Sequence, residues 1–195
     1  MALTPSAMLP LGTPLPDAAL PDPNNQNWRL SESMGEKGLL VMFICNHCPF
    51  VVHLAPFFET LYDRLDRLGF KVVAINSNDV DAYPADAPDK MSEFAAQYRL
   101  PFPYVLDESQ AVAKSFKAAC TPDFFLFDGQ GKLGYRGQLD ASRPGNEVPV
   151  TGVDLLAAAE LLAQGKFPLK PARNPVRVAA SNGRASKKPL TVSLR

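Results

Sequence analysis

The sequence is poor in three features that would each assign it to a class of protein: cysteine, long apolar runs and net charge. Three cysteines in 195 residues are too few for a disulfide scaffold. No apolar run approaches the roughly 20 residues that span a membrane. Residues 1–16 contain four prolines and no Lys or Arg, which is not the pattern of a secretory signal peptide. We therefore expect a cytoplasmic protein without a membrane-bound part.

The formal net charge of zero conceals an asymmetry between the two ends of the chain. The first 165 residues carry 12 Lys and Arg against 20 Asp and Glu, a net charge of −8, and the last 30 residues carry +8. Residues 167–195 are basic, contain Pro, Ser, Asn and Gly, and show no periodicity, which predicts a flexible C-terminal tail. Because no aromatic residue follows Phe167, bases have nothing to stack on, and nucleic acid is not an expected partner.

An apolar run that ends in two closely spaced cysteines is the most informative part of the sequence. Residues 39–44 have the length and composition of a buried strand, and Cys45-Asn46-His47-Cys48 follows at once. A long amphipathic helix pattern then begins, so both cysteines are expected on its first turn, close enough to form a disulfide. Because a helix N-terminus favours an anion, we expect a lowered pKa at Cys45, with Asn46 and His47 tuning its thiolate.

The apolar periodicity of the rest of the chain predicts an α/β domain. Its expected core is a central mixed β-sheet with helices on both faces. The expected strands are 24–30, 39–44, 70–77, 104–106, 123–127 and 132–138. The first expected helix runs from the cysteines to Gly69 and is kinked at Pro56. The others are 88–100, 109–118 and 151–165, the last of which has a capping box in its first turn. Residues 1–23 are rich in proline and predict an extended arm, anchored by apolar side chains at Leu9, Leu11, Leu15 and Leu20. The domain itself is expected to span 24–166.

Five segments carry a resemblance to a known family. FICNHCPF, VVAINSND, FPYVLDESQ, AACTPDFFLFD and YRGQLDASRPGN resemble, in order and spacing, the peroxiredoxin-like, thioredoxin-fold proteins of the alkyl hydroperoxide reductase/thiol-specific antioxidant group. The resemblance covers roughly residues 14–165 and implies a thioredoxin-like fold with redox chemistry at Cys45 and Cys48. It also implies a cis peptide bond before Pro122, beside the cysteines, where Thr121 and Pro122 would shape an edge for substrate docking.

Several positions differ from the patterns of the group. When Cys48 is aligned with the peroxidatic cysteine, Cys45 stands where a threonine belongs, and no arginine lies just before Phe124. Fast peroxidase activity is therefore not expected, because these donors would stabilise the developing negative charge. Leu39 stands where thioredoxin has a buried acid, so proton transfer to and from Cys48 must use another group or water. Arg136 lies in a resembling segment and is interpreted as part of a surface ion pair.

A zinc half-site is the main alternative interpretation of the two cysteines. Structural zinc takes four ligands, and Cys45, Cys48, His47 and Cys120 would make such a set. Because His47 lies between the two cysteines and is expected to point elsewhere, no metal is predicted. His47 is then either a tuning residue or an exposed residue without a role. Cys120, two residues before Pro122, is either a third reactive thiol or, as is commoner for a lone cysteine, a small buried apolar residue.

The sequence therefore predicts a thiol–disulfide oxidoreductase in which Cys45 attacks a substrate disulfide and Cys48 resolves the mixed disulfide. The expected substrate is a disulfide-containing protein or a small thiol compound, an external dithiol supplies electrons, and no cofactor is needed. Two alternatives stay open. One is a weak thiol peroxidase that uses Cys48, with Cys45 as the resolving cysteine, and the other is a redox-sensing binding module without turnover.

Overall fold

The computed structural model describes residues 9–167 of the chain. The strands are β1 (Ala19–Pro21), β2 (Asn27–Arg29), β3 (Gly38–Phe43), β4 (Phe70–Asn76), β5 (Tyr104–Leu106), β6 (Asp123–Asp128) and β7 (Leu133–Gly137), and the helices are α1 (Pro49–Leu54), η1 (Ala55–Phe57), α2 (Phe58–Arg67), η2 (Pro84–Asp86), α3 (Pro88–Gln97), α4 (Ala111–Phe116) and α5 (Val153–Ala163). All but β1 and η2 fall on elements that the sequence predicts. The predicted tail lies outside the described residues except for Phe167. Within the described part, no helix is long and apolar enough to cross a bilayer.

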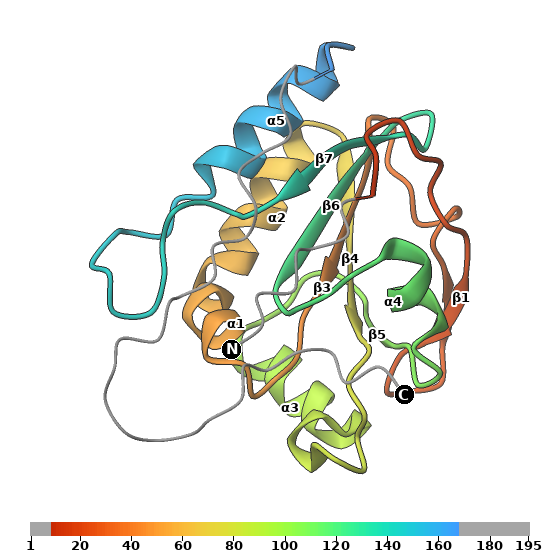
Figure 1. Ribbon diagram of the computed structural model, residues 1–195, viewed down its shortest axis with the longest axis vertical. Helices are drawn as coiled ribbons and strands as arrows, with labels where there is room; N and C mark the ends of the chain where they lie inside the picture. Colours follow the sequence, from red (N-terminus) through yellow and green to blue (C-terminus); the bar gives the residue numbers. More distant parts are fainter. Residues whose placement is uncertain (1–8, 168–195) are drawn as a thin grey trace.

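Five strands form one mixed sheet with β3 at its centre (Figure 1). The order is β5-β4-β3-β6-β7, in which β3, β4 and β5 run parallel and β6 and β7 run antiparallel to their neighbours. Phe43, the last residue of β3, is paired with Ile75 of β4 and with Asp123 of β6. The segment that follows Phe43 and the segment that precedes Asp123 therefore meet at the same edge of the sheet.

Side chains of β3 alternate between two apolar layers, one on each face of the sheet. Leu40 and Met42 pack with residues of α1, α2, α3 and α5, whereas Leu39, Val41 and Phe43 pack with α4 and the β1–β2 pair. All five side chains are fully buried. Covering on both faces explains why this strand is continuously apolar in the sequence. The predicted arrangement of a mixed sheet with helices on both faces is confirmed.

The helix that follows the cysteines is divided at Pro56, where the sequence predicts only a kink within one helix. α1 ends at Leu54, the 3₁₀ turn η1 contains the proline, and α2 begins at Phe58. Proline lacks the N–H that would continue the helical ladder, and its ring crowds the preceding turn. The apolar face nevertheless continues across the break, because buried residues of α1 and α2 belong to the same core cluster.

The N-terminal arm lies against the domain, turns at residues 10–13 and then includes a short strand. Leu9 and Leu20 are buried, and Leu11 and Leu15 pack against the same apolar cluster, as predicted. Residues 19–21 form β1, which pairs antiparallel with β2 in a separate two-stranded sheet that the sequence does not predict. A proline-containing segment is tolerated here because an edge strand can leave a backbone donor unpaired.

A distant carboxylate, and not the predicted capping box, holds the start of α5. Gly152 is the N-cap residue and has no side chain that could cap the helix. Asp140, which follows β7, accepts hydrogen bonds from the backbone N–H groups of Thr151 and Gly152, each at 2.7 Å. Asp154 is engaged elsewhere, since the Gln138 amide donates to it at 2.6 Å. The end of β7 and the start of α5 are therefore tied together.

Gly38 offers a test of the central strand, because its backbone leaves no room for a side chain. Its φ is +140°, and an added Cβ would lie 1.9 Å from the carbonyl oxygen of Phe127. We expect Gly38→Ala to lower the free energy of unfolding by at least about 3 kcal/mol in urea denaturation. Gly145→Ala is the matched control: its φ is +82° but nothing lies within 4 Å, so the expected loss is about 1 kcal/mol. Equal losses in the two variants would contradict this explanation.

Candidate active site

The two cysteines lie where β3 passes into α1, at the edge of the sheet described above. Ile44 prolongs β3 by donating its backbone N–H to the carbonyl of Ile75 at 3.0 Å, and Cys45 follows. α1 begins at Pro49, so that Cys48 is its N-cap residue and Cys45 lies outside the helix. The prediction that both cysteines occupy the first helical turn is therefore wrong.

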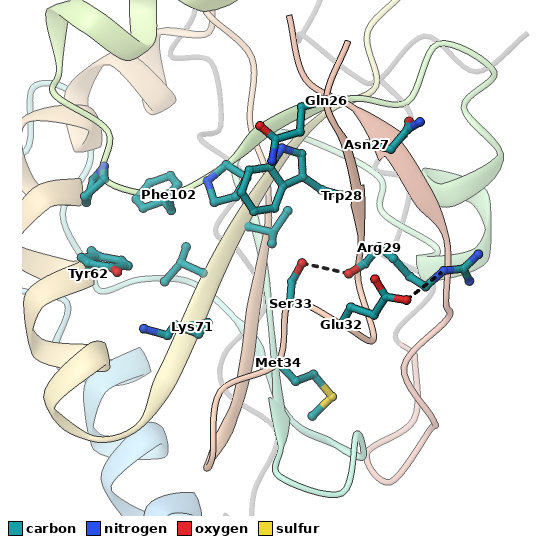
Figure 2. A pocket seen from close by; sticks show the side chains of 14 residues that line it. Gln26, Asn27, Trp28, Arg29, Glu32, Ser33, Met34, Tyr62, Lys71 and Phe102 are labelled. Carbon is teal, nitrogen blue, oxygen red and sulfur yellow. Dashed lines mark hydrogen bonds and ion pairs between the residues drawn. The ribbon is translucent and has the colours of Figure 1, made fainter. Parts of the chain in front are cut away.

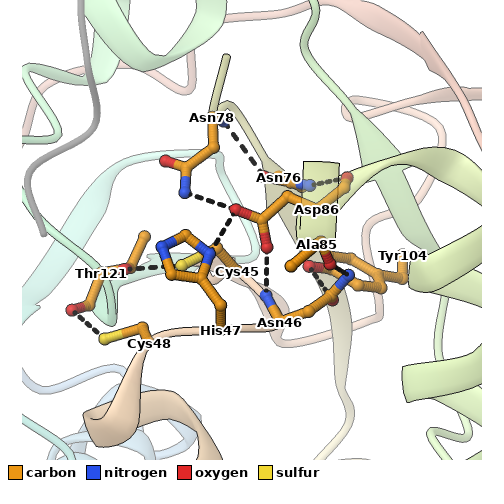
Figure 3. A network of polar contacts seen from close by, with 10 residues as sticks. All are labelled: Cys45, Asn46, His47, Cys48, Asn76, Asn78, Ala85, Asp86, Tyr104 and Thr121. Atoms are coloured by element: carbon orange, nitrogen blue, oxygen red, sulfur yellow. Dashed lines mark hydrogen bonds and ion pairs between the residues drawn. The ribbon is translucent and has the colours of Figure 1, made fainter. Parts of the chain in front are cut away.

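Thr121 joins the two thiols. Its hydroxyl lies 3.2 Å from Cys45 Sγ, and its carbonyl oxygen accepts a hydrogen bond from Cys48 Sγ at 3.4 Å (Figure 3). The Thr121–Pro122 peptide bond is cis, and β6 begins directly after it at Asp123. Thr121 is only 7% exposed, so its polar groups face the protein interior. The structure brings Thr121 and Pro122 beside the cysteines, while substrate docking at this edge stays a prediction.

The acidities of the two thiols are the reverse of the prediction. The hydrogen bond from Cys45 lowers the pKa of Cys48 to about 6, against the effect of burial, and the backbone N–H groups of Phe50 and Val51 contribute in the same direction. The same bond raises the pKa of Cys45, as do burial and the negative charge of Asp86. A thiolate is favoured where the first amides and the positive end of a helix face it. Cys48 is therefore the thiol that ionises first, and on ionisation it loses the hydrogen bond that it donates to the Thr121 carbonyl.

A buried carboxylate, Asp86, holds the turn between the two cysteines (Figure 3). Asp86 lies in η2 and is fully buried. Its Oδ1 accepts a hydrogen bond from the backbone N–H of Asn46, and its Oδ2 accepts one from Asn78 Nδ2 and contacts His47 Nδ1, all at 2.7 Å. The sequence does not single out Asp86, because an acidic residue is ordinary in the polar loop 78–87.

Asn46 and His47, which are predicted to tune the thiolate, are both fixed by neighbouring side chains. Asn46 Oδ1 accepts a hydrogen bond from the Tyr104 hydroxyl at 3.0 Å. The His47 ring stacks on Tyr83, with ring centroids 5.0 Å apart and planes 11° apart. The His47 side chain is 20% exposed, and one of its ring nitrogens lies within 4.8 Å of Cys45 Sγ. Both residues thus belong to the site, while their influence on the thiolate stays a prediction.

Two further residues lie close to the site but differ from expectation. Cys120, next to Thr121, is half-buried and so is more exposed than a small core residue. Arg136 is 1% exposed and does not belong to a surface ion pair. Its guanidinium donates to the Asp123 carboxylate and to the Lys117 carbonyl, each at 3.0 Å. Arg136 therefore braces the two ends of the loop that contains Thr121.

Both thiols are closed off from solvent. A groove of about 460 Å³ lies beside β2 and β4, where Trp28, Lys71 and Phe102 contribute to its lining (Figure 2). It does not include Cys45 or Cys48, which are 0% and 1% exposed. A substrate disulfide can therefore reach either sulfur only after the turn between the cysteines or the neighbouring loop has moved.

Comparison with known proteins identifies the family of the chain. The model of the redoxin family matches residues 10–155, about three quarters of the sequence. The chain belongs to the redoxin family. The thiol-disulfide oxidoreductase ResA of Geobacillus thermodenitrificans (strain NG80-2) is 26% identical over 123 residues. That match covers 63% of this redoxin and 66% of the relative, slightly less than two thirds of its length.

Solved structures support the fold. An uncharacterized conserved protein from Geobacillus kaustophilus is 45% identical, with a TM-score of 0.81 and coverage of 85% of this redoxin and 89% of that chain. The thioredoxin domain of a thiol-disulfide oxidoreductase from Bacteroides vulgatus is 19% identical, with a TM-score of 0.57 and coverage of 67% and 89%. At that identity the likeness concerns the fold alone. The predicted family and the thioredoxin-like fold are both confirmed.

The order of the two acidities can be tested by following the ultraviolet absorbance of thiolates against pH. We expect one thiolate per reduced chain to form with a midpoint near pH 6, because the Cys45 thiol and the start of α1 stabilise the ionised form of Cys48. Cys48→Ser should abolish this transition, and Cys45→Ser should move it toward the ordinary thiol value of about 8.5. Cys120→Ser is the control and should leave it unchanged. A transition that survives Cys48→Ser and disappears in Cys45→Ser would restore the assignment made from the sequence.

Proposed function

We propose that this redoxin is a thiol–disulfide oxidoreductase that cycles Cys45 and Cys48 between two thiols and a disulfide. The observation that carries the proposal is that both buried sulfurs lie against Thr121 beside the start of α1, with Cys45 Sγ 3.2 Å from its hydroxyl and Cys48 Sγ 3.4 Å from its carbonyl oxygen. Two cysteines three residues apart, with one of them held as a thiolate, have the properties that rapid disulfide exchange requires. The name of the ResA relative, a thiol-disulfide oxidoreductase, supports the same activity.

In the proposed reaction Cys48 attacks first. Its thiolate forms a mixed disulfide with one sulfur of the substrate disulfide, and the other substrate sulfur leaves as a thiolate. Cys45 then gives its proton to that thiolate or to water and attacks the sulfur of Cys48. The intramolecular disulfide forms, and the second substrate thiolate is released. This order is the reverse of the one that the sequence predicts, because the N-terminus of α1 lies at Cys48 and not at Cys45.

The proposal extends to partners and location. The substrate is a disulfide-containing protein or a small disulfide, and Thr121 with Pro122 forms the edge on which it docks. An external dithiol returns the protein to its reduced form, so that no organic cofactor takes part. A cytoplasmic location is proposed from the sequence alone, since reduced thiols are the resting state in that compartment.

Trapping of mixed disulfides tests both the activity and the order of attack. With an oxidised protein substrate, the Cys45→Ser variant should accumulate a mixed disulfide between Cys48 and the substrate, because the cysteine that would resolve this disulfide is missing. Cys48→Ser should react far more slowly, because the remaining Cys45 is a buried thiol with a raised pKa. Mass spectrometry identifies the trapped cysteine, and either variant should reduce turnover to that of the uncatalysed reaction.

Cys120→Ser is the matched control for trapping and should turn over like the unmodified protein. Trapping mainly on Cys45 in the Cys48→Ser variant would show that Cys45 attacks first. Failure of the unmodified protein to form any disulfide between residues 45 and 48 would overturn the oxidoreductase itself and favour a binding role.

A weak thiol peroxidase is the second candidate, because the thiolate lies at Cys48, the position aligned with a peroxidatic cysteine. Its thiolate would attack a hydroperoxide, become a sulfenic acid and release an alcohol. Cys45 would then condense with the sulfenic acid and release water. We expect hydroperoxide consumption to be slower than disulfide exchange, because a cysteine stands in the place of the usual threonine. Consumption that is faster than exchange, with sulfenic acid on Cys48 in the Cys45→Ser variant, would place the peroxidase first.

A further inference from the structure

We propose that Cys45, His47 and Asp86 bind a zinc ion when the two cysteines are reduced. The proposal goes beyond disulfide exchange, which needs no metal. Each residue offers one ligand atom: a sulfur, a ring nitrogen and a carboxylate oxygen. These three atoms lie within 4.8 Å of one another, so His47 does not point away from the cysteines as the sequence suggests. Sulfur, nitrogen and oxygen donors together form a ligand set that zinc accepts in proteins.

Movements of roughly one ångström are enough to place the three atoms around one ion, since they lie within 4.8 Å of one another. Zinc–ligand bonds at tetrahedral angles separate the ligand atoms by about 3.3–3.6 Å. His47 Nδ1 and Asp86 Oδ2 are 2.7 Å apart and must move apart by less than an ångström. His47 is the ligand best able to supply this movement, because its side chain is 20% exposed whereas that of Asp86 is fully buried; its ring nitrogens are themselves buried, so the ion enters when the ring turns outward.

The neighbouring residues already orient the ligands as an outer shell would. The backbone N–H of Asn46 and the side-chain amide of Asn78 each donate to Asp86 at 2.7 Å. The ring of Tyr83 is stacked on His47 and limits its rotation. Hydrogen bonds to a ligating carboxylate and a fixed imidazole plane are the features that hold ligands ready in metal sites.

Charge also favours a divalent cation at this position. The Cys45 thiolate and the Asp86 carboxylate together neutralise Zn²⁺, and binding releases the Cys45 proton to solvent. His47 must turn a lone pair toward the ion, and the proton of Nδ1 can move to Nε2, which has no hydrogen-bond partner among the described residues. A water molecule or the neighbouring sulfur of Cys48 completes the coordination.

Oxidation of the cysteines releases the ion. A substrate disulfide accepts two electrons as the disulfide between Cys45 and Cys48 forms; it leaves as two thiolates, and the metal leaves as Zn²⁺. Cys45 sulfur in a disulfide is no longer a thiolate and ceases to be a ligand. Bound zinc would therefore hold Cys45 away from the exchange reaction until the metal departs.

Calorimetric titration of zinc into the reduced full-length protein tests the site. The chain has only three Cys and two His, so competing soft ligands are few. We expect one zinc per chain, no binding after Cys45→Ser or after oxidation, and affinity lowered at least about 10-fold by His47→Ala and by Asp86→Asn. The matched controls are His53→Ala and Cys120→Ser, which change the same residue types outside the cluster and should bind zinc normally.

Cobalt supplies a second readout that does not depend on heats of binding. A thiolate-to-cobalt absorption band should appear in the reduced protein and be absent in Cys45→Ser, and thermal melting verifies that each variant is folded. Zinc affinity that is unchanged in both His47→Ala and Asp86→Asn would assign binding to the cysteines alone and overturn the proposal, as would the absence of binding.

Disulfide exchange is measured separately with a chelator present. A protein that exchanges disulfides but binds no zinc therefore refutes only this inference, and one that binds zinc without forming the disulfide refutes only the proposed function.

Discussion

The buried carboxylate of Asp86 fixes the turn that carries both cysteines. A carboxylate removed from water is costly unless hydrogen-bond donors surround it. Asp86 accepts hydrogen bonds from the backbone N–H of Asn46 and the amide of Asn78, and its third polar neighbour is a ring nitrogen of His47 at 2.7 Å. Two of these three neighbours belong to the segment between the cysteines, so the carboxylate is satisfied only when that segment adopts this turn. The same turn delays the start of α1 to Pro49 and leaves Cys48 as the N-cap residue.

This placement makes two identical side chains chemically different. Cys48 faces the amides of the first turn of α1, which carry partial positive charge, whereas Cys45 faces the negative charge of Asp86. Cys48 is therefore the more acidic of the two thiols. Thr121 contacts both sulfurs, through its hydroxyl at Cys45 and its carbonyl oxygen at Cys48, so one residue holds the pair in place. Redox reactivity is thus a property of the turn and not of either cysteine alone.

The sequence predicts most of the fold because the signals for it are local, whereas the errors concern contacts between distant segments. Residues 39–44 are apolar throughout because β3 is covered on both faces, and Pro56 breaks a helix whatever surrounds it. Asp86, by contrast, accepts a hydrogen bond from Asn46, which lies 40 residues away in the sequence. The pattern of apolar residues does not show which acidic side chain of a polar loop will be buried. One local signal was available for the site: proline is common at the first position of a helix, and Pro49 indicates that Cys48 precedes α1.

The loop that carries Thr121 depends on a second buried carboxylate. Arg136 of β7 donates to Asp123 at the start of β6 and to the carbonyl of Lys117, and its guanidinium lies 4.7 Å from the Phe125 ring. Burial raises the pKa of Asp123 to about 6, although Arg136 acts in the opposite direction. Such a pair adds little net stability, because desolvation offsets the attraction between the charges. Its effect is to fix both ends of the loop, so that the hydroxyl and the carbonyl of Thr121 can each reach a different sulfur.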